Sequence, residues 1–171
     1  MIKHPEVDEY PSFYAGYVNA IAGDDLLSIL PQVNQVTLSL LSDLPEEKWG
    51  YRYEEGKWSV KEVVAHLADS ERIFVNRALR FARNDTTPLP GFEQNDYVPE
   101  CNASARSLPD ILEEFATIRQ STILLFRSFT EEMWGRSGIA SGGMVTVRAI
   151  GFIIAGHEQH HQNILKERYL D

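Results

Sequence analysis

The chain of 171 residues has a single cysteine, Cys101, and therefore cannot form an internal disulfide. One isolated thiol is the usual state of a protein in a reducing compartment, so we expect a cytoplasmic location. No uninterrupted apolar run approaches the roughly 20 residues that cross a bilayer, and the first residues lack the apolar core of a secretory signal. We therefore expect no association with a membrane.

Basic residues are scarce relative to acidic ones, because 16 lysines and arginines stand against 25 aspartates and glutamates, a formal net charge of −9. Such a surface repels a phosphate backbone unless a local basic stripe outweighs the total. One candidate stripe exists, but the acidic surroundings favour a solvated or ion-paired helix face. It consists of Arg72, Arg77, Arg80 and Arg83. We expect a small-molecule substrate and no nucleic acid, with anionic small molecules as candidate ligands of these arginines.

Strand patterns are nearly absent, and the spacing of apolar residues is typical of helices. With 43% hydrophobic and 24% charged residues, the composition is that of a globular chain, and we expect one domain over residues 1–171. The periodicity predicts an all-α fold, a four-helix bundle whose long helices cover about 25–42, 60–83, 107–129 and 146 onward.

Local signals mark where these helices begin and where the chain turns. Ser59 and Glu62 form the S-x-x-E pattern of a capping box, and Ser107 opens a similar S-x-x-D pattern. Pro31 lies inside the first helix and predicts a kink or a break near Leu30. Segment 84–100 contains several prolines and a glycine, so it is predicted to be a loop.

The last helix contains GHEQHHQNIL, residues 156–165, with three histidines in five positions. His157 and His161 are four residues apart and point the same way on a helix, so they can share one metal ion. The stretch also reads as H-E-x-x-H, the zinc-protease signature. That interpretation fails, because the residues after His161 lack the further Gly and His of the extended pattern.

A third imidazole is available in the second long helix, where His66 lies on the apolar side of VVAHLADSE. A lone histidine there is usually a hydrogen-bonded core residue, but three unpaired imidazoles in one core are unfavourable. Together His66, His157 and His161 form a three-histidine site with open positions, which is typical of a catalytic metal. Spacing alone does not decide whether His161 or His160 is the ligand. Glu158 flanks the same helix face and is a candidate base.

Asp69 lies three residues after His66 and has two interpretations. It can orient the His66 imidazole from behind the metal, as carboxylates often do for metal-binding histidines. It can equally pair with the neighbouring Arg72, and this surface pair is the interpretation we favour.

The stretches KWSVKEVVAHLADSERIF, RALRFARND-TTPLPGF and TVRAIGFIIAGHEQHH together resemble the DinB/YfiT-like superfamily of metalloenzymes. The similarity covers the chain from about Tyr17 to Tyr169. Members are four-helix bundles, often dimeric, that hold one divalent metal through one histidine of the second helix and an H-x-x-x-H pair of the fourth. The resemblance implies His66, His157 and His161 as ligands, with His160 a neighbour, and a homodimer as one expected state.

Characterised members of this superfamily use a low-molecular-weight thiol, as bacillithiol S-transferases and mycothiol-dependent isomerases do. The resemblance therefore implies a metal-dependent thiol S-transferase acting in detoxification, with Arg77 and Arg80 as candidate ligands for carboxylates of the thiol cofactor. Two alternatives stay open. One is a metal-dependent hydrolase in which Glu158 serves as base, and the other is a non-catalytic metal-binding bundle of the stress response. The ligand set is compatible with zinc, nickel, manganese or iron.

Overall fold

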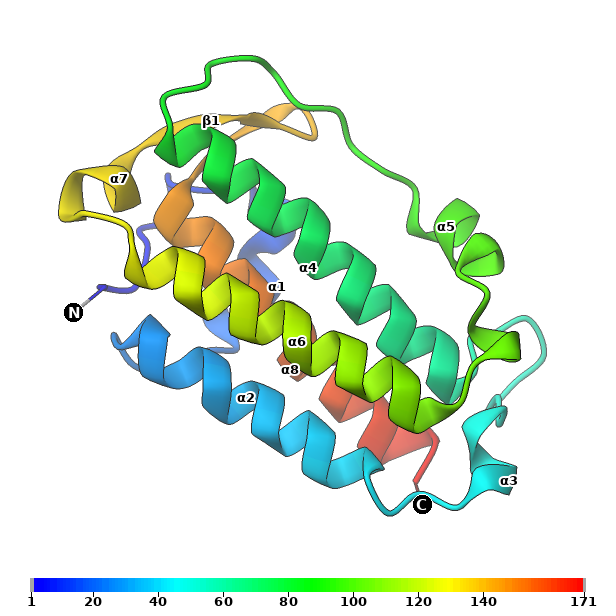
Figure 1. The fold of residues 1–171 in the computed structure, drawn as a ribbon. Coiled ribbons are helices and arrows are strands. Elements are labelled where there is room, and N and C mark those ends of the chain that lie inside the picture. Colours follow the sequence, from blue (N-terminus) through cyan, green and yellow to red (C-terminus); the bar gives the residue numbers. More distant parts are fainter. Residues whose placement is uncertain (1, 171) are drawn as a thin grey trace.

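The structure, a computed structural model, describes residues 2–170 and is dominated by four long helices (Figure 1). They are α2 (Leu26–Leu41), α4 (Val60–Ala82), α6 (Leu108–Arg127) and α8 (Val147–Arg168). Their bounds agree with the four predicted helices to within about three residues at each end, the ordinary uncertainty of helix termini. The predicted all-α four-helix bundle is confirmed.

The long helices do not pack in the order in which they follow one another along the chain. Helix α4 packs against α6 and α8, and α2 packs against the same two helices. Helices α2 and α4 are therefore diagonal to each other, as are α6 and α8. In Figure 1, α6 lies in front between α2 and α4, and α8 lies behind. This arrangement brings the His66 helix directly against the helix that carries the other histidines.

Side-chain caps fix where three of the long helices begin. Ser59 accepts a hydrogen bond from the Glu62 backbone N–H, and the Glu62 carboxylate accepts one from the Ser59 N–H at 2.7 Å, so the predicted capping box is confirmed. Ser107 caps α6, and Thr146 caps α8 by accepting from the Ala149 N–H. These caps satisfy backbone donors that have no partner within the helix.

Two predictions about helix continuity are corrected by the structure. Helix α2 continues through Pro31, so the predicted break near Leu30 is absent, whereas a kink stays a prediction; Pro31 is exposed while Leu30 and Val33 are buried. Segment 84–100 is not entirely a loop, because its end forms α5 (Gln94–Glu100). The Glu93 side chain accepts from the Asn95 N–H and starts this helix, a capping signal that the neighbouring prolines obscured.

The sequence also failed to predict a β-hairpin that precedes α8. Strand β1 (Ser137–Ala140) pairs antiparallel with β2 (Gly143–Thr146), and Ala140 faces Gly143 across the turn. Ser141 and Gly142 in the turn both have positive φ, which suits a tight two-residue hairpin. The remaining elements are short: η1 (Ser12–Tyr14), α1 (Ala15–Asn19), α3 (Glu46–Trp49), η2 (Ala103–Ala105) and α7 (Glu131–Gly135).

The buried core consists of two apolar clusters separated by a polar layer. Along α8 the first cluster ends at Ala155 and the second resumes at Leu165. Along α4 the second cluster ends at Ala68, and the first cluster resumes at Phe74. The buried residues between these limits include histidine, glutamate, serine and glutamine side chains. The fold therefore sets a polar layer across its middle, which is where the candidate site lies.

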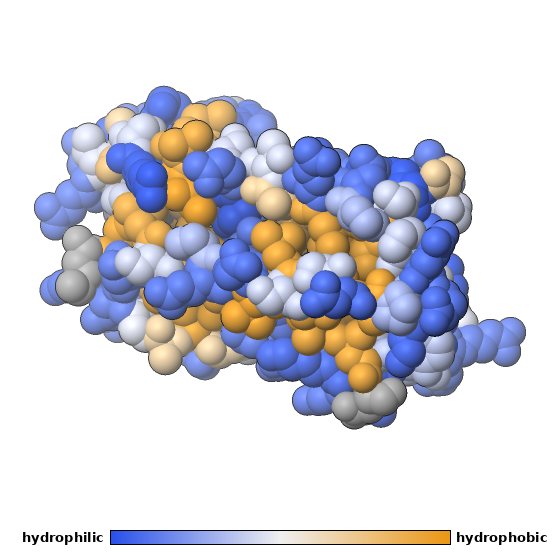
Figure 2. All heavy atoms as spheres, turned by 60° about the horizontal axis from the view of Figure 1, so that its bottom comes forward, coloured by the Kyte–Doolittle hydropathy of each residue, from blue (hydrophilic) through white to orange (hydrophobic). Residues whose placement is uncertain are grey.

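The surface is predominantly polar but not uniformly so. Figure 2 shows apolar side chains in a broken band across the face that includes α2, bordered by hydrophilic residues. Val36 of α2 is one of the exposed large hydrophobic residues. Within residues 2–170, no helix is both long enough and apolar enough to cross a membrane.

Candidate metal centre

Helices α4 and α8 bring three histidines together in the polar layer. The Nε2 atom of His66 lies 3.1 Å from Nε2 of His157, and one ring nitrogen from each of His66, His157 and His161 lies within 4.8 Å of the others. No second group of three potential metal ligands is found in residues 2–170. His160 is exposed and stands outside the group, so the juxtaposition selects His161.

The three imidazoles are buried and therefore neutral. Burial lowers the pKa of His66 to about 4 and that of His161 to about 3. The pKa of His157 lies well below its ordinary value, first because of burial and then because of the neighbouring histidines. A metal ion requires the neutral ring, because protonation removes the lone pair that it binds. The chain thus holds the group in the protonation state that a metal needs.

The geometry of the group fits a single divalent ion. Two nitrogens bound tetrahedrally at 2.0–2.1 Å from an ion are about 3.3 Å apart, close to the separation of the His66 and His157 nitrogens. Nδ1 of His161 is buried without a hydrogen-bond partner among the described residues. A buried ring nitrogen without a partner is unfavourable, and a bound cation would satisfy it. The three histidines could therefore hold one metal and leave coordination positions open.

Ser70 and two aromatic rings hold the imidazoles in place. Ser70 Oγ lies 3.3 Å from Nδ1 of His66, one turn away on α4. The Trp58 ring packs on His66 at 4.7 Å between centroids, and the Tyr17 ring meets His157 edge-on at 5.3 Å. The sequence analysis did not identify Ser70, although a residue four positions after His66 lies on the same helix face and can contact its ring.

Helix α1 reaches the site through a close contact with α8. A Cβ atom at Gly156 would lie 2.0 Å from the backbone oxygen of Tyr17, so only glycine allows this approach. Gly156 directly precedes His157, and the contact seats the Tyr17 ring against both His157 and His160. The glycine therefore shapes one wall of the candidate centre.

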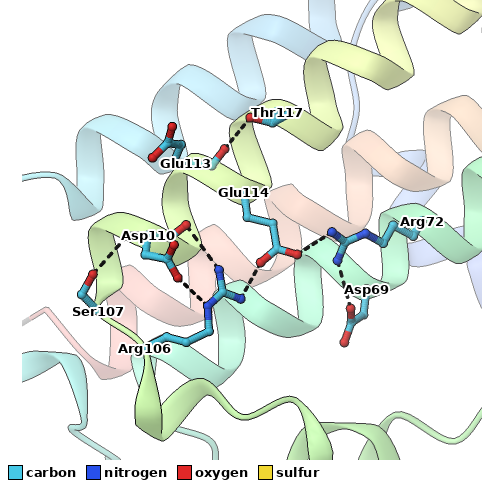
Figure 3. A network of polar contacts seen from close by, with 8 residues as sticks. All are labelled: Asp69, Arg72, Arg106, Ser107, Asp110, Glu113, Glu114 and Thr117. Carbon is cyan, nitrogen blue, oxygen red and sulfur yellow. Dashed lines mark hydrogen bonds and ion pairs between the residues drawn. The ribbon is translucent and has the colours of Figure 1, made fainter.

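Asp69 takes the surface pairing that we favoured over a role behind His66. Its carboxylate lies 3.4 Å from Arg72, which also pairs with Glu114 of α6 (Figure 3). Arg106 extends the network by pairing with Glu114 and Asp110 (Figure 3). Asp69 points outward into this network, whereas the Ser70 hydroxyl lies beside the imidazole, 3.3 Å from Nδ1 and 3.5 Å from Nε2 of His66.

Glu158, the candidate base, belongs to a buried ionic cluster beneath the histidines. Its carboxylate accepts a hydrogen bond from Thr37 at 2.5 Å and forms an ion pair with Arg119 at 2.8 Å. Arg119 also donates two hydrogen bonds to Glu71 and one to the Leu30 carbonyl, which joins all four long helices. Burial raises the pKa of Glu158. No hydrogen bond links Glu158 to the three histidines within the described chain, and its role as a base stays a prediction.

A cavity of about 260 Å³ leads from the surface to His157. Ser70 and His157 form its polar inner end. Phe13, Tyr14, Tyr17, Phe74 and Phe92 provide the aromatic part of its walls, and Glu93, Gln94 and Ser141 provide a further polar part. A small molecule that enters this metal-facing cavity therefore meets both aromatic rings and polar side chains before it reaches His157.

The two predicted cofactor-binding arginines lie on the same face of α4 but differ in their partners. Arg80 pairs with Asp85 at 2.6 Å and is partly exposed. Arg77 is buried and donates to the Pro90 carbonyl and the Ser141 hydroxyl. Both line a second cavity of about 400 Å³ beside α4. Their role in cofactor binding stays a prediction.

Residues 29–165 match the family model of the DinB superfamily. The chain belongs to this superfamily. The predicted family is therefore confirmed, and the site residues occupy the matched region. The DinB chain is also 28% identical over 145 residues to a protein of Oceanobacillus iheyensis named "Putative metal-dependent hydrolase OB0413", an alignment that covers 81% of this chain and 82% of the relative.

Two solved structures share the fold. YfiT from Bacillus subtilis, described as a probable metal-dependent hydrolase with an unusual four-helix bundle topology, superposes with a TM-score of 0.74 at 16% identity. That match covers 97% of the DinB chain and 91% of YfiT. The mycothiol-dependent maleylpyruvate isomerase superposes with a TM-score of 0.68 at 14% identity, over 84% of this chain and 60% of the isomerase. At these identities the matches establish the fold alone.

Proposed function

We propose that this DinB protein is a metal-dependent enzyme that transfers a low-molecular-weight thiol to an electrophilic small molecule, a reaction suited to detoxification. His66, His157 and His161 would hold one divalent ion. The observation that carries the proposal is that three neutral imidazoles, with no carboxylate among them, form one group, and that His157 of this group lines a cavity with aromatic walls. Closed structural metal sites use four protein ligands, whereas catalytic sites keep a position free.

A divalent ion with three neutral ligands retains its full charge, and when bound it lowers the pKa of a coordinated thiol or water. The chain's own residues would orient the metal-binding imidazoles and exclude water from them. Ser70 fixes the ring of His66, and the Trp58 and Tyr17 rings shield the imidazoles. Cys101, the one cysteine, is not part of the histidine group, so the reacting sulfur would come from a small molecule.

Hydrolysis is the second candidate. Its support is that two relatives, the Oceanobacillus protein and YfiT, are described as metal-dependent hydrolases. The same three-histidine site would then activate water rather than a thiol. Support for the thiol comes from the mycothiol-dependent isomerase, which has the same fold.

One experiment separates these activities. The metal-loaded protein is incubated with 1-chloro-2,4-dinitrobenzene and, in turn, bacillithiol, mycothiol, glutathione or no thiol, and with 4-nitrophenyl acetate without thiol. The thiol proposal predicts conjugation that depends on metal, on one thiol and on His157. Release of nitrophenol without thiol, lost in His157→Ala, would support hydrolysis instead. Bound metal with neither product would favour the non-catalytic metal-binding bundle.

A further inference from the structure

A second cavity beside α4 is lined by three arginines and by no acidic residue. It lies between α4 and segment 89–97, which runs alongside the helix toward α5 (Figure 1), and its volume is about 400 Å³. The charged residues in its walls are Arg72, Arg77 and Arg80. In a chain with a formal net charge of −9, a cavity whose charged lining residues are all arginines is a candidate site for an anion. We call this space the arginine cavity.

The three arginines differ in whether their charge is already neutralised. Arg72 and Arg80 pair with carboxylates on the protein surface. Arg77 is only 4% exposed and, within the described chain, donates to neutral acceptors alone, which are the Pro90 carbonyl at 2.9 Å, the Ser141 hydroxyl at 3.0 Å and the Tyr14 hydroxyl at 3.4 Å. Across residues 2–170 no carboxylate lies within 4.0 Å of its guanidinium.

A buried guanidinium without a counter-charge is energetically unfavourable, because burial removes its hydration and neutral acceptors replace only part of it. The other deeply buried arginine of this chain, Arg119, obeys the usual pattern and pairs with two carboxylates. Arginine also presents a planar set of donors that matches a carboxylate. Arg77 therefore has the environment of a residue whose anionic partner is a ligand.

We infer that the arginine cavity binds the carboxylate of a small organic acid through Arg77. The body of that molecule would pack on the apolar side chains Ile73, Leu89 and Phe92, which line the same space. The guanidinium contact makes Arg77 the binding residue, whereas Arg80 contributes a charge that Asp85 has already neutralised.

The arginine cavity adjoins the metal-facing cavity. Phe92 lines both, and Ser141, which accepts from Arg77, lines the metal-facing one. Arg77 is seven residues beyond Ser70 on α4, a rise of about 10 Å. The role of Arg77 in that reaction rests on the proposed function. Arg77 would hold the acidic end of a substrate or thiol whose reactive end approaches the histidines.

The test compares a carboxylate with its neutral amide. Binding of 4-phenylbutyrate and 4-phenylbutanamide is measured by calorimetry on the parent protein and on Arg77→Gln, Arg80→Gln and His157→Ala. We expect the parent to prefer the carboxylate roughly tenfold or more, the difference that charge-assisted hydrogen bonds provide. Arg77→Gln should lose this preference, while Arg80→Gln, the matched control in the same cavity, should retain it.

The His157→Ala variant separates this inference from the metal proposal. A preference that persists there belongs to the arginine cavity, whether or not the protein binds metal or turns over a substrate. Equal binding of both probes to the parent, or a preference kept by Arg77→Gln, would overturn the inference. So would a preference lost in His157→Ala but kept in Arg77→Gln, since the carboxylate would then bind at the histidines.

A second measurement covers the case in which Arg77→Gln does not fold. The Nε–H signal of Arg77 is followed by nitrogen-15 NMR in the otherwise unaltered protein, with Arg77→Lys used for assignment. The signal should shift when 4-phenylbutyrate is added and stay in place with the amide. An unchanged signal at saturating carboxylate would contradict the inference.

Discussion

Nε2 of His66 on α4 lies 3.1 Å from Nε2 of His157 on α8, although the residues are 91 positions apart in the chain. The two helices begin at fixed points, because Ser59 caps α4 and Thr146 caps α8. Each cap sets the register of its helix, and the packing of α4 on α8 then brings the imidazoles together. The candidate centre is therefore a property of one helix pair, which makes it accessible to single substitutions.

Replacing a proposed ligand should remove the metal. We expect untagged protein, purified without a nickel column, to contain close to one divalent ion per chain by elemental analysis. His66→Ala and His157→Ala should each lose it, because two remaining imidazoles bind far more weakly than three. His160→Ala is the matched control on the same helix and should keep the parent's content. Metal retained in His66→Ala with intact circular dichroism would show that the centre lies elsewhere.

Removing the hydroxyl that contacts the His66 ring should weaken metal binding without abolishing it. Ser70→Ala takes away the group 3.3 Å from His66 Nδ1, and such orienting partners are worth about 10- to 100-fold in metal affinity. Asp69→Asn is the neighbouring control, since Asp69 pairs with Arg72 and should leave the affinity within about twofold. Competition with a chromogenic chelator measures both. The reverse order of effects would assign the orienting role to Asp69.

Arg119 should matter far more for stability than an exposed arginine. Arg119→Met leaves the carboxylates of Glu71 and Glu158 buried together without a counter-charge, and we expect it to lower the free energy of unfolding by about 3–5 kcal/mol. Arg72→Met removes ion pairs of a side chain that is half exposed, and the expected loss is at most about 1 kcal/mol. Urea denaturation compares the two. Similar losses would mean that the buried cluster contributes little.

Adding one methyl group at Gly156 should disturb both stability and the candidate centre. The Cβ of Gly156→Ala would meet the Tyr17 backbone oxygen at 2.0 Å, so α1 must move away from α8 at a loss of about 1–3 kcal/mol. Gly16→Ala, in α1 with no atom within 4 Å of the added Cβ, should be neutral or slightly stabilising. Thermal unfolding and metal content are compared. An unaltered melting temperature in Gly156→Ala would argue against this close approach.

Local features of the sequence were sufficient to predict the four long helices. The S-x-x-E box at Ser59 acts within three residues, and the alternation that places His157 and His161 on one face acts within a single turn. Such signals depend only on neighbours along the chain. Where they were weak or mixed with prolines, as in α5, the local patterns predicted the wrong structure.

The pairing of distant side chains was decided by the tertiary structure. The sequence set Glu158 beside the histidines as a candidate base, but packing places its carboxylate on Arg119 and Thr37. The sequence also grouped Arg77 with Arg80, whereas the fold buries one without a carboxylate and pairs the other with Asp85.

Helix positions and helix faces were thus determined by the sequence itself, through caps and periodicity that operate over a few residues. Which faces meet, and which buried charges share a partner, depended on the diagonal order of α2, α6, α4 and α8. That order reflects the combined packing of side chains far apart in the chain, and no short motif encodes it. The sequence was thus sufficient to identify His66 as a candidate ligand, but only the folded bundle brings it close to His157.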